Sequence, residues 1–192
     1  LGFEDEERTI PQASYVTGCV PSELTISLEQ GALAKAEYSF TGCRFLTKKG
    51  TLLAGTHKDA WNEKGYNNSN EVYYCGLTIN PTSETETNPA PMFAYVSSAS
   101  ISINNNLTEN KSVATLGAFD ISSGKFEVKV SPEVYFTSVD SIEALKNNAD
   151  CGFQVIVSRD NQGIIYDVPM IGLGSSIPSI SDSDPIMMSL EG

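Results

Sequence analysis

Basic residues are scarce in this sequence of 192 residues, where 12 lysines and arginines stand against 24 aspartates and glutamates. The net charge of −12 argues against a surface that grips nucleic acid, because such a surface needs lysine and arginine to displace counterions from phosphate. It does not argue against a surface that nucleic acid merely passes. A cationic membrane-binding role is disfavoured too, and no apolar run approaches the roughly 18 residues that a membrane-spanning helix needs.

Motifs of catalysis and of metal binding are also missing. The one histidine, His57 in "AGTHKDAW", would have to serve any Ser–His–Asp triad, and no "GxSxG" elbow accompanies it. We expect His57 to be an exposed loop residue. The stretch "GLGSS" at Gly172–Ser176 lacks the lysine of a phosphate-binding loop, and Ser181–Asp184 lacks the glycine and glutamate of a calcium loop. The sequence therefore predicts neither an enzyme nor a bound cofactor or metal ion.

Cysteines are few and widely spread. No CxxC pair occurs, which argues against a zinc site, and the four residues are Cys19, Cys43, Cys75 and Cys151. We expect four reduced thiols, as in a cytosolic product. A bridge between Cys19 and Cys43 would instead suit a secreted protein. Three N-x-S/T sequons, at Asn67, Asn106 and Asn110, keep that alternative open, although chance explains them in a chain so rich in Asn, Ser and Thr.

What the sequence does have is period-two alternation, which is typical of half-buried strands. In "ELTISLE" the residues Leu24, Ile26 and Leu28 alternate with polar ones, and "AKAEYSFTG" continues the pattern with Tyr38 and Phe40. A glycine-containing turn, "QGAL", joins the two stretches. The pattern therefore predicts a β-hairpin over residues 23–41 whose apolar face packs on the core of the subunit.

Residues Thr47–Pro91 break this rhythm with turn-rich, polar stretches such as "KGYNNSN" and "NPTSETETNPAP". The short apolar pieces "TLLAG" and "VYYCGLTI" predict small strands inside the segment. We interpret it as a long insertion outside the core, with a hairpin of its own and a flexible linker at Asn80–Pro91. Alternation then resumes: "KFEVKV" predicts a strand that Pro132 interrupts, "FQVIVS" and "IIYDVPM" predict a hairpin, and "PIMMSLE" predicts a last strand.

One helix is predicted, in "DSIEALKNNADCG". Asp140 is its expected N-cap, with Glu143 at capping-box spacing, and Gly152 stands where the helix is expected to stop. The expected fold is mainly β: a single antiparallel β-sandwich or barrel-like domain over residues 1–192, with one short α-helix. The chain opens at Leu1 rather than at Met, which leaves room for a leader or an N-terminal segment before it.

An asparagine triplet, Asn104–Asn106, ends the strand "SASISI" before Leu107. Asparagine tolerates left-handed backbone and bonds its own chain, so the triplet predicts a strand end or a wide turn. The order "SASISINNNL", "ATLGAFDI", "SSGKFEVKVSPEVYF", a short helix and a hairpin ending in "DVP" resembles the tail tube proteins of phages with long, non-contractile tails. "VTGCVPSELTISLEQGALAKAEYSFTG" resembles the first half of that family. The resemblance covers Thr17–Gly42 and Ser97–Glu191, leaves out the insertion, and departs at Ser131-Pro132, where the family's strand continues.

The resemblance implies a structural subunit of a phage virion. Its sheets would join between subunits into hexameric rings, which stack into a tube whose lumen conducts double-stranded DNA without tight binding. The implied partners are further copies of the chain, a tape measure protein and tail terminator or tip proteins, with no membrane and with assembly in the host cytoplasm. Exposed strand edges, hazardous in a monomer, would be used in such a ring. The alternative is a secreted or surface Ig-like adhesion or binding module.

Two sets of residues carry this assembly hypothesis. The polar face of the hairpin is expected to line the lumen, where acidic groups would repel phosphate, and its members are Glu23, Thr25, Ser27, Glu29, Lys35, Glu37, Ser39 and Thr41. The same face could instead be the outer, solvated side of a sandwich. The turn-rich segment supplies the candidates for contact with a neighbouring subunit or ring: Lys48, Lys49, Trp61, Tyr66, Asn67 and Asn68.

Overall fold

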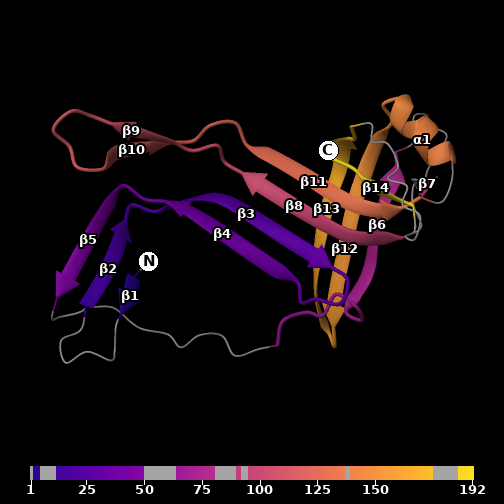
Figure 1. Ribbon diagram of the computed structural model, residues 1–192, viewed down its shortest axis with the longest axis horizontal. Coiled ribbons are helices and arrows are strands. Elements are labelled where there is room, and N and C mark those ends of the chain that lie inside the picture. Colours follow the sequence, from indigo (N-terminus) through magenta and orange to yellow (C-terminus); the bar gives the residue numbers. More distant parts are fainter. Residues whose placement is uncertain are drawn as a thin grey trace. The chain divides into compact units, whose positions relative to one another are not determined.

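The fold is seen in a computed structural model of the chain, which describes residues 2–4, 12–49, 64–80, 90–91, 95–136, 139–174 and 186–192. These residues form 14 strands and one helix (Figure 1). In chain order the elements are β1 (Gly2–Glu4), β2 (Gln12–Thr17), β3 (Val20–Glu29), β4 (Lys35–Thr41), β5 (Arg44–Lys49), β6 (Val72–Ile79), β7 (Ala90–Pro91), β8 (Val96–Asn104), β9 (Thr108–Lys111), β10 (Ala118–Ser122), β11 (Glu127–Tyr135), α1 (Val139–Lys146), β12 (Asp150–Arg159), β13 (Gln162–Gly172) and β14 (Met187–Ser189).

The strands form four sheets. Their orders are β1-β2-β5, β10-β9, β14-β11-β8-β3-β4 and β13-β12-β6-β7. The pairs β1–β2, β2–β5, β9–β10, β6–β12, β12–β13 and β11–β14 are antiparallel. The prediction of a mainly β, antiparallel fold with one short helix is confirmed, and the arrangement is consistent with a β-sandwich-like fold. None of the sheets among the described residues closes into a barrel.

The chain divides into two compact units. Unit 1 comprises Leu1–Leu24, Glu37–Glu63 and Ile103–Glu127, and unit 2 comprises Thr25–Ala36, Lys64–Ser102 and Val128–Gly192. Strands β3, β4, β8 and β11 contribute residues to both units. The single domain with an insertion at residues 47–91 stays a prediction.

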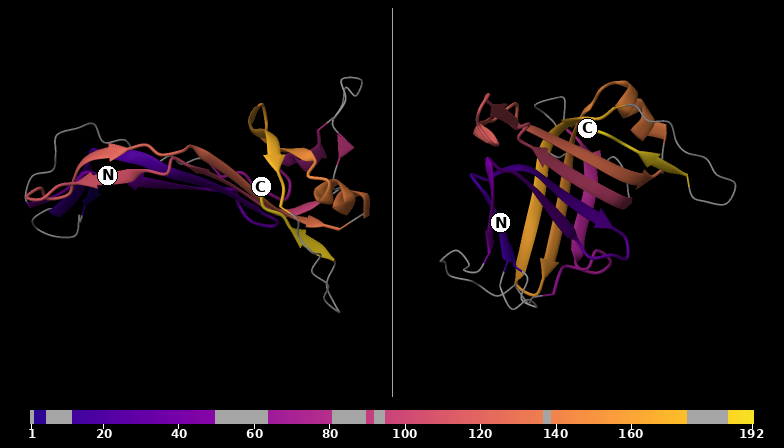
Figure 2. Two further views of the ribbon diagram at one scale, coloured as in Figure 1. Left: turned by 90° about the horizontal axis from the view of Figure 1, so that it is seen from above. Right: turned by 60° about the vertical axis from the view of Figure 1, so that its left-hand side comes forward.

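The core of unit 2 is built on β12, which lies between β6 and β13 (Figure 1 and Figure 2, right). Phe153 and Val155 of β12 and Leu77 of β6 have no exposed surface, and Val157 is 2% exposed. Phe153 stands opposite Leu77 in the register. The predicted hairpin is confirmed, because Arg159 pairs with Gln162 around a two-residue turn whose Asp160 has φ +53°. Asp tolerates that left-handed backbone, which a β-branched residue would not.

Strand β11 runs without a break through Pro132, so the predicted interruption is wrong. Pro132 is fully buried, and its carbonyl accepts a hydrogen bond of 3.0 Å from the Leu190 amide, on the β14 side. Proline lacks only the amide donor, and its carbonyl and its extended φ still suit a ladder. The strand therefore loses one donor there and keeps its length of nine residues.

Helix α1 exists where it was predicted, although both of its ends differ. It begins at Val139, so Asp140 lies in its first turn and is not the N-cap. It ends at Lys146, and Gly152 belongs to β12 instead of stopping the helix. The stop is made by Asn148, whose φ of +50° places it in the left-handed region that commonly follows a helix. The Asn147 amide closes the last turn by donating to the Glu143 carbonyl at 3.0 Å.

The segment 47–91 contributes to the core, which corrects the prediction that it stands outside it. Strand β6 is "VYYCGLTI", and it forms the centre of a sheet through its pairing with β12. Asn80, expected to begin a flexible linker, is anchored: its amide donates to Asp150 and its side chain donates to Pro169, both at 2.8 Å. The predicted strand "TLLAG", together with His57, lies outside the described residues.

In unit 1 the asparagine triplet joins three segments of the chain. The Asn105 amide donates to the Ser22 carbonyl and its Nδ2 donates to the Pro21 carbonyl, each at 2.9 Å. Asn106 has φ +46°, and its Nδ2 donates to the Lys125 carbonyl at 2.7 Å. The triplet therefore ends β8, as predicted, and its amides bond the backbone ahead of β11 and at the start of β3.

Candidate functional site

Strand β4 forms one edge of the five-stranded sheet, and it has no strand beyond it among the described residues. Its residues Lys35–Phe40 are all exposed, on both faces. Such an edge presents a row of backbone donors and acceptors that another strand can pair with. The strand "KAEYSFT" contains no proline to prevent this. We therefore take β4 as the centre of the candidate site.

The polar face of the β3–β4 hairpin is accessible along its length. Glu23, Thr25 and Ser27 of β3 are half-buried, whereas Glu29 and the β4 residues Lys35, Glu37 and Ser39 are exposed. Three carboxylates face one ammonium group in this set, so the face carries a net negative charge. All side chains on it are short or charged. The arrangement suits a smooth, hydrated surface, and the side of an assembly on which it lies stays a prediction.

The apolar face of the same hairpin is only partly covered. Ile26 and Leu28 of β3 are 5% and 6% exposed, which confirms the prediction for that strand. On β4, Tyr38 is 63% exposed and Phe40 is 48% exposed, so the prediction that they pack on the core is wrong for the single chain. Because β4 is an edge strand, nothing in the described part of the chain covers them. These two rings are available to a partner.

Three of the predicted contact residues hold the β3–β4 turn within unit 2. The Tyr66 carbonyl accepts from the Ala34 amide at 2.9 Å, and Asn67 forms a β-bridge with Leu33. Asn68 donates its side-chain Nδ2 to the Glu29 carbonyl at 3.0 Å.

The same segment is fixed from its other side by Arg159. The guanidinium donates to the Lys64 carbonyl at 2.8 Å, lies 5.1 Å from the centre of the Tyr66 ring, and pairs with Glu71 at 3.6 Å. The turn of the hairpin is thus fastened to β12. Contacts of Tyr66, Asn67 and Asn68 with a neighbouring copy stay predictions.

The remaining predicted contact residues are less informative. Lys49 of β5 is exposed, and Lys48 lies beside it on the same strand. Trp61 lies outside the described residues.

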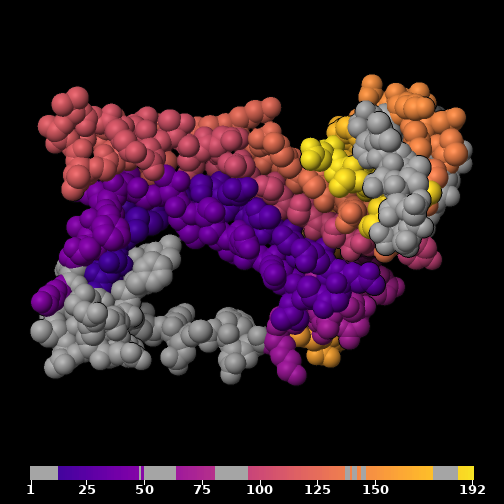
Figure 3. Space-filling view, in the orientation of Figure 1, coloured from indigo at the N-terminus to yellow at the C-terminus, as the bar shows by residue number. Residues whose placement is uncertain are grey.

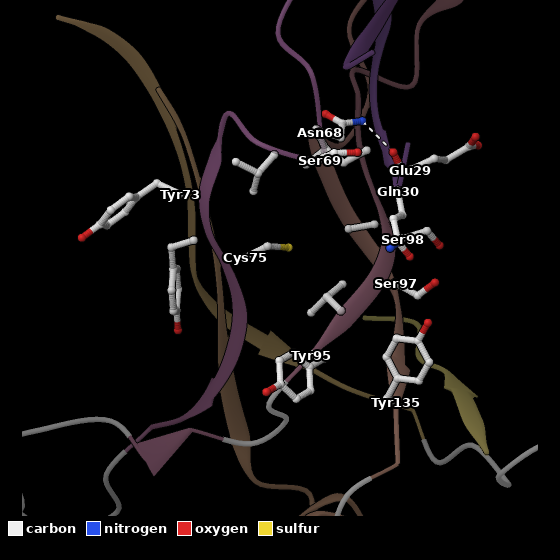
Figure 4. A pocket seen from close by; sticks show the side chains of 15 residues that line it. Glu29, Gln30, Asn68, Ser69, Tyr73, Cys75, Tyr95, Ser97, Ser98 and Tyr135 are labelled. Carbon is white, nitrogen blue, oxygen red and sulfur yellow. Dashed lines mark hydrogen bonds between the residues drawn. The ribbon is translucent and has the colours of Figure 1, made fainter. Parts of the chain in front are cut away.

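A pocket of about 480 Å³ opens in unit 2 beside this turn (Figure 4). Cys75 points into it from β6 toward Ser97 and Ser98 of β8, while Tyr73 points away. Burial raises the pKa of the Cys75 thiol to about 11. A thiol that stays protonated at neutral pH is a poor nucleophile and a poor metal ligand. The pocket therefore offers space and hydroxyl groups but no reactive group.

Unit 1 carries an exposed apolar surface that the sequence reasoning did not identify. Between the start of β5 and the residues leading into β10 lies a groove of about 690 Å³, lined by Arg44, Phe45, Leu46, Thr115, Leu116, Gly117, Ala118 and Phe119. Beside it, Val113 in the turn of the β9–β10 hairpin is 97% exposed. The hairpin lies at the surface in the space-filling view (Figure 3). The sequence signal for this surface is "SVATLGAF", which places several apolar residues in the turn between two strands, outside any alternating strand pattern.

The described residues show no metal-binding cluster of histidine, cysteine and carboxylate side chains. All four cysteines lie in the described part of the chain, and none of them forms a disulfide. Among the described helices, none has the length and apolar character to cross a membrane.

Comparison with known proteins adds one match. The family described as phage tail tube protein matches the chain over residues 2–192. A search of the curated proteins finds no match to this chain.

Proposed function

The chain belongs to the phage tail tube protein family, and from this premise we propose that it forms hexameric rings which stack into a tube that conducts genomic DNA. The family match makes the chain a structural component of a phage tail. The finer statement, rings closed by sheet pairing around an acidic channel, is supported by the open edge of β4. That edge is the single observation that carries the proposal.

The lateral contact is proposed to form when β4 of one subunit pairs with the sheet of the next. A head-to-tail contact of this kind closes into a ring when its rotation divides a full turn. Main-chain hydrogen bonds would provide the pairing, as in other strand additions. Tyr38 and Phe40, 63% and 48% exposed in the single chain, would then be covered by the neighbouring copy. Burying two aromatic rings stabilises such a contact by several kcal/mol at about 25 cal/mol per Å².

The polar face of the hairpin is proposed to line the channel. It lies opposite the apolar face, so covering Tyr38 and Phe40 leaves Glu23, Glu29 and Glu37 toward water. Carboxylates on a confined channel wall raise a repulsive potential toward phosphate, which keeps DNA from adhering in transit. Segment 47–91, through Lys48, Lys49, Trp61, Tyr66, Asn67 and Asn68, is proposed to face a neighbouring subunit or ring.

The proposed partners follow from the position of a tube in a tail. Copies of this chain contact one another, a tape measure protein occupies the growing tube, and terminator and tip proteins close its ends. Assembly is proposed to take place in the host cytoplasm, where the four cysteines would remain reduced.

The experiment uses the double variant Tyr38→Ser, Phe40→Ser. Both side chains are largely exposed, so we expect the isolated subunit to keep its circular-dichroism spectrum and its urea midpoint. We expect ring and tube formation, measured by sedimentation velocity and negative-stain microscopy, to be lost. The matched control is Tyr73→Ser, because Tyr73 is 82% exposed but lies on β6, inside a sheet. Tubes from the double variant that equal those of the wild type would refute the role of β4.

A further inference from the structure

We propose that the β9–β10 hairpin is a docking element between stacked rings: the turn around Val113 of one copy enters the groove of a second copy, between β5 and β10. This inference rests on the proposed function and assigns the contact along the tube, which the edge of β4 does not supply. The occupant of the groove is a second copy of this chain.

The chain carries both halves of such a contact. Val113 and Leu116 of the turn are 97% and 96% exposed, and Leu116 is itself part of the groove lining. Val113, which is not among the lining residues, is the apolar projection of the turn. The groove of about 690 Å³ presents Phe45 and Phe119, which are 64% and 62% exposed. Thr115 of the same turn also lines the groove. When Val113 of one copy enters the groove of the next and the relation is not mutual, the contact is heterologous and repeats without closing, which is the geometry of a filament or a tube.

The hairpin is held firmly enough to act as a docking element. The Ala118 amide donates to the Cys43 carbonyl at 3.1 Å, which fixes the turn end of the hairpin, where Ala118 pairs with Lys111, against the residue before β5. Gly117 has φ +90°, and a side chain there would overlap the Cys43 carbonyl oxygen. Within the turn, Thr115 donates its hydroxyl to the Ser112 carbonyl at 2.8 Å. The turn therefore keeps a fixed position against the start of β5.

The exposed apolar area is large enough for a protein contact. Phe45, Leu46, Leu116 and Phe119 together leave roughly 500 Å² of side chain open, taking about 150–250 Å² for each large side chain. That is near the upper limit of the largest apolar patch on typical monomers, about 300–600 Å². It is also more than half of the roughly 800 Å² that each partner buries in a standard interface.

Charge favours a second copy over an unrelated partner. The turn Ser112–Leu116 has no charged residue, so it enters an apolar groove without desolvating an ion. Arg44 is the charged residue of the groove, and it meets a chain whose net charge is −12. A tail tube consists of many copies of its subunit, so a second copy of this chain is present next to every groove in the proposed assembly.

Connectivity points to the tube axis. The chain leaves the five-stranded sheet at the end of β8, forms the hairpin, and re-enters the sheet at the start of β11. If sheets pair sideways through β4, the ends of their strands face the rings above and below. The hairpin then extends toward the next ring.

The test compares Val113→Asp with Val139→Asp, each of which adds one carboxylate at an exposed valine. Val139, 63% exposed, lies on α1 in unit 2. We expect both variants to fold and to form rings, and Val113→Asp to raise the protein concentration needed for stacking by about tenfold or more, as loss of one well-buried side chain at a contact does. A complementary pair, Val113→Asp with Phe45→Lys in the same chain, should restore stacking that each change alone weakens.

The outcomes separate the two proposals. If the wild type forms neither rings nor tubes, the proposed function fails. If the wild type forms tubes and Val113→Asp forms them equally well at every concentration, the docking inference fails alone. If folded Val113→Asp forms no rings either, the hairpin belongs to the lateral contact and the axial assignment is wrong. If the complementary pair does not restore stacking, the groove is not the receiving surface.

Discussion

Replacing Gly117 with alanine should destabilise unit 1 by about 3 kcal/mol. A residue with a side chain costs roughly 1–2 kcal/mol in left-handed backbone, and Gly117 has φ +90°. The new Cβ would come closer than 3.0 Å to the Cys43 carbonyl oxygen, a separation that Cβ atoms essentially never show. The hairpin must then lift from Cys43 and lose the hydrogen bond from the Ala118 amide, worth about 1 kcal/mol.

Two other glycines separate these contributions. Gly31 has φ +78° but has no atom within 4 Å of its would-be Cβ, so Gly31→Ala should show the backbone cost alone, about 1–2 kcal/mol. Gly172 has neither a left-handed backbone nor a nearby atom, so Gly172→Ala should fall within about 0.5 kcal/mol of the wild type. The order expected for loss of stability is therefore Gly117, then Gly31, then Gly172.

The assay is urea unfolding with hydrogen exchange of individual amides. Exchange is needed because the chain has two compact units, and a single transition would hide a change confined to one of them. We expect the Ala118 amide to lose protection in Gly117→Ala and to keep it in the other two variants. Equal stability losses in Gly117→Ala and Gly31→Ala, with Ala118 still protected, would refute the contact between Gly117 and the Cys43 carbonyl.

Three further predictions concern the asparagine triplet, a buried thiol and the proposed channel. Asn105→Ala should cost about 1 kcal/mol, measured by urea unfolding, because the Nδ2 bond to the Pro21 carbonyl is lost; an unchanged midpoint would show that water replaces the amide. Burial raises the pKa of Cys75 to about 11 from its ordinary 9.0, so the unfolded chain ionises first. The urea midpoint should accordingly fall as pH rises from 9 to 11, less steeply in Cys75→Ala, and equal slopes in the two proteins would argue against it. Replacing Glu23, Glu29 and Glu37 together with lysine should leave tube assembly unchanged but slow DNA release. The effect should be strongest at low salt, because about 0.1 M salt screens interactions between charges beyond roughly 10 Å. A density map of the tube with these three residues on its outer surface would contradict the channel assignment.

The sequence predicted the elements whose signals are local. The hairpin of β12 and β13 followed from alternation around a short polar turn, and α1 followed from its apolar spacing. The predicted end of the helix was wrong because Asn148, and not Gly152, adopts the left-handed conformation that follows the helix. Local propensity decides that a helix exists. Its last residue depends on which of the nearby glycine or asparagine residues adopts the left-handed backbone conformation that follows the helix.

Other features depend on neighbours that the sequence does not name. Strand β6 lies in a segment full of turn residues, and it becomes core because β12, more than 70 residues later, pairs with it and covers Leu77. Pro132 was predicted to interrupt its strand because proline has no amide to donate. The missing amide affects hydrogen bonding to one neighbouring strand only, and the sequence does not show which neighbour that is. In both cases a distant partner, absent from any local window, decided the outcome.

The exposed rings of β4 show the same dependence at the level of the whole assembly. Alternation in "AKAEYSFTG" correctly marks an apolar face, but it does not say whether the same chain or another copy covers it. In this chain Ile26 and Leu28 are covered from within, while Tyr38 and Phe40, one strand further out, are not. Natural edge strands usually carry charges or prolines that prevent pairing. Strand β4 carries Lys35 and Glu37 on one face, but it also exposes two aromatic rings on the other. Exposed aromatic rings on an edge strand favour association with another chain, so the mismatch between the pattern and the burial supports the proposed pairing of β4 with a second copy.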